Sequence, residues 1–191
     1  MTLFIAGLVI FFGTHLFSAV RSRAPGKDLK QKLGYGPYMG LYSLVSIVGF
    51  VLICMGFGAT RDAGVLYTPP GWGRYVNYAL MIPALILLVA SQIPAGHIKK
   101  LARHPMLVAV KLWATGHLLS NGELNAVILF GAFLAYAVFD RIMVKRRGDN
   151  GPGPDVVAKP VNDIIAVVVG LIAYVAIAHY LHPVLFGVSI R

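Results

Sequence analysis

The sequence predicts an all-α, polytopic transmembrane helix bundle of about six spanning helices, with both termini on the outside. The 191-residue chain is 58% hydrophobic and only 13% charged, with a mean hydropathy of +0.75. Its 17 basic residues outnumber the 7 acidic ones and lie in short clusters between apolar segments, as in integral membrane proteins. Without RNA-binding aromatic motifs or zinc-ligand spacing, this pattern argues against nucleic acid as a partner and for a lipid bilayer.

Six apolar segments approach the roughly 20 residues that a spanning helix needs. They cover residues 2–20, 36–58, 75–93, 105–120, 122–142 and 162–182. Most basic residues lie in the connections after the first, third and fifth segments: Arg21, Arg23, Lys27, Lys30, Lys32, Lys99, Lys100, Arg103, Arg141, Lys145, Arg146, Arg147 and Lys159. Because Lys and Arg favour the cytoplasmic side, these alternate connections are predicted to lie inside.

The chain is predicted to form a single transmembrane domain over residues 1–191. Residues 148–160, rich in Gly, Pro and Asp, form a loop before the last helix. The first apolar segment precedes its basic residues, so we interpret it as an uncleaved spanning helix and not a signal peptide. The single cysteine, Cys54, excludes an intramolecular disulfide and a cysteine-based metal cluster.

Two histidines lie inside predicted spanning helices, where an ionisable side chain is costly and tends to face the bundle interior. His15 precedes Arg21 by six residues and is predicted about 9 Å from the inner edge of its helix. His117 lies thirteen residues, or about 20 Å, beyond His104 at the inner end of the fourth segment. The depths of His15 and His117 in the membrane are therefore predicted to differ by about 10 Å. Neutral imidazoles can bind haem iron or another transition metal. The alternative is that each imidazole only hydrogen-bonds a neighbouring helix.

The fourth segment carries further candidate ligand-binding residues. Lys111 either snorkels to the inner interface or contacts an anion such as a haem propionate or lipid phosphate. Trp113, one turn before His117, either flanks a flat ligand or belongs to the core. Arg103 and His104 precede Pro105, which starts a helix, so they either mark its beginning or form a phosphate or carboxylate site there.

Sequence motifs of common hydrolases are missing. The chain has no G-x-S-x-G, no H-E-x-x-H, no P-loop and no paired carboxylates within the apolar segments. Any acid–base chemistry would therefore use histidine, tyrosine or lysine.

Together, these residues resemble the NnrU family of polytopic membrane proteins. The resemblance rests on His15 in the first helix, the basic connection after it, a second helix rich in Tyr and Ser, and the pattern R-H-P-x(7)-W-x-x-x-H from Arg103 to His117. It covers residues from about Phe11 to about Gly148. The family is associated with bacterial denitrification and nitric oxide metabolism, which implies an inner-membrane location and nitrogen-oxide respiratory proteins as partners.

The family is related to the 15-cis-zeta-carotene isomerases, which hold haem b between two histidines. The resemblance places His15 and His117 at the ligand positions, with Lys111, Arg103, His104 and Trp113 around the cofactor. Ala114 stands where the isomerases have a cysteine that is an alternative iron ligand, so the chain departs from the isomerases there.

Two other function classes remain open. The RHP motif is also similar to that of isoprenylcysteine and phospholipid methyltransferases, which bind S-adenosylmethionine, but their downstream glutamate pair is absent. A membrane enzyme acting on an apolar lipid or isoprenoid would have a cavity lined by His104, His117 and Lys111. A cofactor-free assembly factor would use both intramembrane histidines structurally.

Overall fold

The computed structural model describes residues 1–186, and all named secondary-structure elements in that range are helices. The long helices are α1 (Thr2–Val20), α3 (Tyr35–Gly58), α4 (Gly73–Gln92), α6 (Pro105–Ser120), α7 (Leu124–Arg146) and α8 (Pro160–Ala176). Short helices α2 (Leu29–Leu33), α5 (His97–Ala102) and α9 (His182–Phe186) and a π-helical turn, η1 (Ile177–Leu181), complete the elements. Each predicted apolar segment corresponds to a long helix, so the predicted all-α bundle is confirmed.

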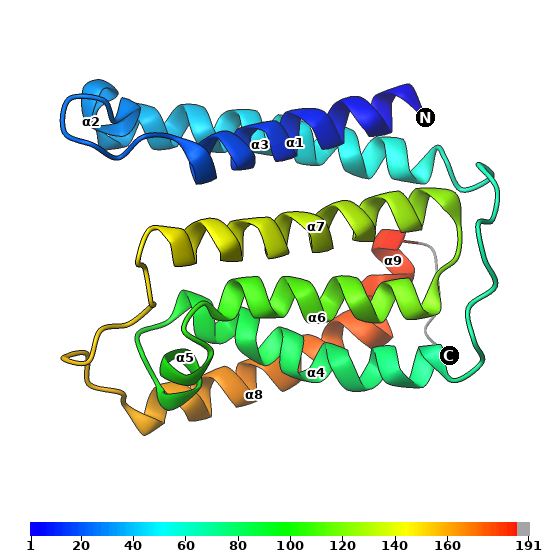
Figure 1. Ribbon diagram of the computed structural model, residues 1–191. Coiled ribbons are helices and arrows are strands. Elements are labelled where there is room, and N and C mark those ends of the chain that lie inside the picture. Colours follow the sequence, from blue (N-terminus) through cyan, green and yellow to red (C-terminus); the bar gives the residue numbers. More distant parts are fainter. Residues whose placement is uncertain (187–191) are drawn as a thin grey trace.

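The long helices run back and forth, and the N-terminus of α1 lies at the same end of the bundle as α9 (Figure 1). Five helical segments of the described residues are long and apolar enough to span a membrane: Thr2–Val20, Tyr35–Gly58, Gly73–Gln92, Leu124–Arg146 and Pro160–Val184. The fourth predicted span is α6, whose 16 residues extend about 24 Å, less than a bilayer core of about 30 Å. Six spans and outside termini therefore remain a prediction.

Helices α1 and α3 form a close antiparallel hairpin along one side of the bundle (Figure 1). A Cβ atom at Gly56 would lie 2.5 Å from the backbone of Phe4, and one at Gly49 would lie 2.7 Å from the backbone of Phe11. The absence of side chains at these two positions lets the helix backbones approach, as is common for membrane helix pairs. Phe4 and Ile53 are buried in the interface.

The other long helices form the rest of the bundle, and α7 is the one beside the α1–α3 hairpin (Figure 1). Helix α4 packs against both α6 and α8, and α6 packs against α7. Asn77 of α4 donates a 2.9 Å hydrogen bond to the Ser120 hydroxyl of α6. Helix α7 thus contacts α1 on one side and α6 on the other, which places it between the two histidine-bearing helices.

The connection 59–72 joins the hairpin to the remaining helices at the N-terminal end of α1 (Figure 1). Its Leu66 backbone N–H donates to the Gly122 carbonyl at 2.8 Å, and the Leu124 N–H donates to the Gly64 carbonyl at 2.9 Å. The Tyr67 hydroxyl donates to the carbonyls of Leu118 and Asn121. These bonds hold the connection across the turn between α6 and α7.

At the opposite end, α5 and the loop 148–160 pack against each other. Lys100 donates from Nζ to the carbonyls of Pro154 and Val156, at 3.3 and 2.8 Å. The backbone N–H of Lys159 donates to the Ala95 carbonyl at 3.0 Å. The loop that precedes the last long helix is therefore tied to the rest of the bundle.

Candidate functional site

His15 lies on α1 within a group of aromatic rings. Its imidazole stacks on Phe11 with ring centroids 4.1 Å apart and meets Tyr42 of α3 at 5.3 Å and Tyr136 of α7 at 5.7 Å. Its Nδ1 lies 2.7 Å from the Phe11 carbonyl oxygen. A carbonyl can only accept, so Nδ1 carries the proton and the Nε2 lone pair is left for another partner.

His117 has the same arrangement on α6. Its imidazole stacks on Phe130 of α7 at 4.5 Å and lies 5.4 Å from the Trp113 ring. Its Nδ1 donates to the Trp113 carbonyl at 2.9 Å, which again leaves the Nε2 lone pair available. Trp113 does lie on the same side of α6 as His117, as their spacing predicts.

His15 and His117 border the same cluster of aromatic residues, and α7 runs through this cluster between them. Phe133 lies at its centre, 5.6 Å from Phe11 and 5.2 Å from Trp113 between ring centroids. The imidazoles reach α7 at Tyr136 and Phe130, which are six residues, or about 9 Å, apart along the helix. This offset agrees with the depth difference of about 10 Å that the sequence predicts.

Each histidine fits a metal in its donor chemistry, because an imidazole ligand ordinarily donates its other ring N–H to a carbonyl or carboxylate. Their spacing does not fit a single iron held from both sides, since metal–nitrogen bonds are about 2 Å long and Phe133 lies between them. Within residues 1–186 no group of three or more His, Cys, Asp or Glu side chains could hold a metal ion.

The other predicted ligand-binding residues do not gather around these histidines. Lys111 precedes Trp113 by two residues, so it projects about 160° away from Trp113 around α6. Arg103 is exposed, and it has a positive φ of 60° in the turn between α5 and α6. The His104 Nε2 donates to the Asp149 carbonyl at 3.2 Å, which ties the RHP motif to the loop 148–160.

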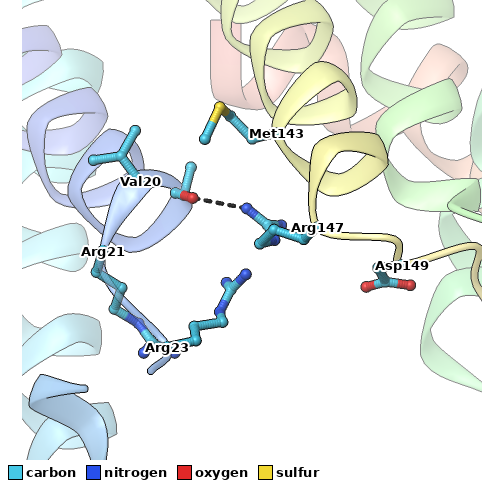
Figure 2. Close-up of a pocket in the computed structure, with 7 residues that line it drawn as sticks. Val20, Arg21, Arg23, Met143, Arg147 and Asp149 are labelled. Carbon is cyan, nitrogen blue, oxygen red and sulfur yellow. Dashed lines mark hydrogen bonds between the residues drawn. The ribbon is translucent and has the colours of Figure 1, made fainter. Parts of the chain in front are cut away.

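A cavity of about 550 Å³ lies elsewhere, between the C-terminal ends of α1 and α7 (Figure 2). It is lined by Ala19, Val20, Arg21, Arg23, Met143, Arg147 and Asp149. None of the predicted ligand-binding residues lines it, so the predicted cavity of His104, His117 and Lys111 is not this one. Figure 2 shows the Arg23 and Arg147 side chains extending into the space between the two helix ends.

In the sequence, Arg21, Arg23 and Arg147 indicate only the topology, although the structure places them around this cavity. The sequence shows that these arginines follow two apolar segments. It does not show that they lie close to one another, because this depends on α1 packing beside α7. The aromatic residues Phe130 and Phe133 of α7 were also missed, because single aromatic residues in an apolar segment carry no signal of which helix they face.

The apolar helices and their antiparallel packing define the class of the molecule, a polytopic helical membrane protein. The chain belongs to the NnrU family: the family model described as "NnrU protein" matches residues 3–190. Comparison with curated proteins gives no match, and comparison with solved structures gives none either.

Proposed function

We propose that this NnrU-family protein resides in the bacterial inner membrane and binds haem b at its intramembrane histidines, with either His15 or His117 on the iron. The observation that carries the proposal is the shared state of the two imidazoles. Both donate from Nδ1 to the carbonyl four residues earlier, and both direct an Nε2 lone pair elsewhere. This is how a protein orients a metal-binding imidazole.

The aromatic surroundings also support the proposal. Phe11, Tyr42 and Tyr136 surround His15, while Trp113 and Phe130 surround His117. Flat rings of this kind can pack against a porphyrin, and a haem would supply redox chemistry or binding of a diatomic gas at its iron. The aromatic residues would hold the ring and exclude water, and an imidazole of His15 or His117 would bind the iron.

The offset between the histidines restricts how they could bind one iron. In the described arrangement an iron would take one of the two imidazoles. Ligation by two histidines and by one histidine give different reduced spectra, so spectroscopy separates the two arrangements.

The first experiment is an absorption spectrum of the detergent-purified chain, produced with ample haem, in oxidised and dithionite-reduced forms. We expect reduced α and β bands that weaken or disappear in His15→Ala and in His117→Ala. His97→Ala, which removes an exposed histidine outside the aromatic cluster, is the matched control and should keep the bands. Equal haem content in the wild type and the doubly substituted protein would return both histidines to a structural role.

The physiological role that we propose is support of nitrogen-oxide metabolism alongside nitrogen-oxide respiratory proteins, which rests on the family alone. Cells lacking the chain should accumulate nitric oxide while respiring nitrite. Complementation by wild type but not by His15→Ala would link the role to the cofactor. Complementation by both would instead favour a cofactor-free assembly factor.

A further inference from the structure

The residues that line the cavity between the ends of α1 and α7 belong neither to the surroundings of the two histidines nor to the aromatic cluster. Three arginines line it: Arg21 and Arg23 follow α1, and Arg147 follows the last residue of α7 (Figure 2). The side chains of Val20 and Met143 line the same cavity. One wall is therefore cationic and another apolar, in a space of about 550 Å³.

The arginines are unequally neutralised. Arg21 forms an ion pair with Asp28, and Arg147 Nη2 lies 3.9 Å from Asp140 Oδ1. Arg23 has no carboxylate within ion-pair distance among residues 1–186, and its hydrogen bond to the Ser18 carbonyl is long, at 3.5 Å. Burial, followed by the like charges of Arg147 and Arg21, lowers the pKa of Arg23. An anion placed among these groups would relieve their repulsion.

The acidic side chain at the cavity is partly engaged elsewhere. Asp149 Oδ1 accepts a 3.0 Å hydrogen bond from the Gly151 backbone N–H and lies 3.7 Å from the His104 imidazole. Arg147 Nη1 donates to the Ala19 carbonyl at 2.7 Å, which holds this guanidinium at the cavity wall. The Arg23 guanidinium extends toward it from the other side (Figure 2).

We propose that this cavity binds the phosphate group of an anionic phospholipid. Guanidinium groups present paired N–H donors that match the oxygens of a phosphate. Basic pockets between membrane helices at the headgroup level are a recurring way of holding anionic lipids.

A lipid explains the apolar wall as well as the charge. Both helices that frame the cavity are candidate membrane spans, and the cavity lies where those spans end. Next to the cavity, the surface of α1 exposes two apolar side chains, Val20 (54% exposed) and Phe17 (49% exposed). Acyl chains can lie along these side chains while the headgroup occupies the cavity, whereas a free phosphate would leave the apolar surface unused. The proposal is independent of haem binding.

The test is native mass spectrometry of the full-length protein in detergent, titrated with phosphatidylglycerol or phosphatidylcholine. We expect phosphatidylglycerol to bind more tightly, and Arg23→Gln to weaken it about fivefold, the effect of one basic side chain at a lipid headgroup. Arg23→Gln suits the test because, within residues 1–186, the one hydrogen bond of the Arg23 side chain is the long one to the Ser18 carbonyl. Arg146→Gln is the matched control: it removes one charge from the same end of the bundle, at the end of α7, but Arg146 does not line the cavity.

Three results would overturn the proposal. Equal binding of the two lipids would show that the site does not select anionic headgroups. Equal weakening by Arg23→Gln and Arg146→Gln would mean that only the overall charge of this end matters. Displacement of phosphatidylglycerol by an equal concentration of inorganic phosphate would identify a site for the free ion. If Arg23→Gln lowers the melting temperature without lipid, Arg23→Lys, which keeps the charge, should retain most of the lipid selectivity.

Discussion

The imidazole Nδ1 of His97 lies 2.8 Å from the carboxylate Oδ2 of Asp163, although the two residues are far apart in the chain. The same carboxylate accepts the backbone N–H groups of His97 and Ile98, at 2.8 and 2.9 Å. The Asp163 side chain of α8 therefore caps the first two residues of α5. This contact fixes the short helix that precedes the RHP turn.

Removing this cap should loosen α5 and leave the long helices in place. We expect Asp163→Ala to cost about 1 kcal/mol of stability, the usual effect of losing a capping side chain. Hydrogen exchange should accelerate in the amides of residues 97–102. Asp155→Ala, in the exposed part of the loop 148–160, is the control. Unchanged exchange in α5 would show that Asp163 does not hold it.

The close approach of α1 and α3 predicts a strong difference between two glycines of the same helix. A methyl group at Gly56 would meet the Phe4 backbone at 2.5 Å, whereas one at Gly40 would have nothing within 4 Å. Gly56→Ala should therefore destabilise the hairpin by about 1–3 kcal/mol, the usual cost of overpacking. Gly40→Ala should be neutral or slightly stabilising, because alanine favours a helix. Thermal unfolding in detergent measures both, and equal melting temperatures would argue against the packed interface.

Phe133 should contribute more to stability than an apolar residue on the outer surface. Its ring contacts Phe11 and Phe12 of α1 and Trp113 of α6, so it joins the hairpin to the rest of the bundle. Phe133 is half-buried, so Phe133→Ala should cost about 2 kcal/mol, somewhat less than the loss for a fully buried aromatic residue. Phe17→Ala, at a half-exposed position of α1, should have little effect on the melting temperature. Comparable losses in the two variants would show that Phe133 is not central.

The connection after α1 should respond to pH through Asp28. Burial acts to raise its pKa, but hydrogen bonds from Arg21 and the Lys30 backbone N–H, with the charges of Arg21 and Arg23, outweigh it and lower the pKa overall. A depressed folded-state pKa gives stability that is present above the unfolded value, about 3.9, and is lost as the pH falls through the folded value.

Asp28→Asn provides the comparison for this pH dependence. At pH 7 the wild type should melt at a higher temperature than Asp28→Asn, and the difference should shrink as the pH falls below about 4. A difference that stays constant across this range would mean that the Asp28 charge does not stabilise the connection.

Hydropathy predicts the long helices closely because a membrane span is set by a continuous apolar segment. The first predicted segment, 2–20, coincides with α1, and the fourth, 105–120, coincides with α6. The last, 162–182, is longer in the structure and changes to a π-helical turn at Ile177–Leu181. Such turns do not alter the apolar pattern of a segment, so hydropathy carries no sign of them.

The candidate sites were less predictable because they depend on which helices are neighbours. His15 and His117 could be selected as costly intramembrane side chains, but the position of α7 between them follows from packing, which no single segment encodes. Trp113 lies on the same helix face as His117 because it precedes it by one turn. Arg23 and Arg147 meet only because the ends of α1 and α7 lie at the same level, and their separation in the sequence conceals this.

The glycine-packed contact between α1 and α3 has a consequence for how the protein is made. These two helices precede α4 and the later long helices in the chain, and the close contacts at Gly49 and Gly56 lie between α1 and α3 themselves. A nascent chain that has delivered residues 1–58 to the membrane can already complete this interface, while α4 is still being translated. The insertion machinery would then release a finished helical hairpin, and α7 would dock against its exposed side once the remaining helices had entered the bilayer.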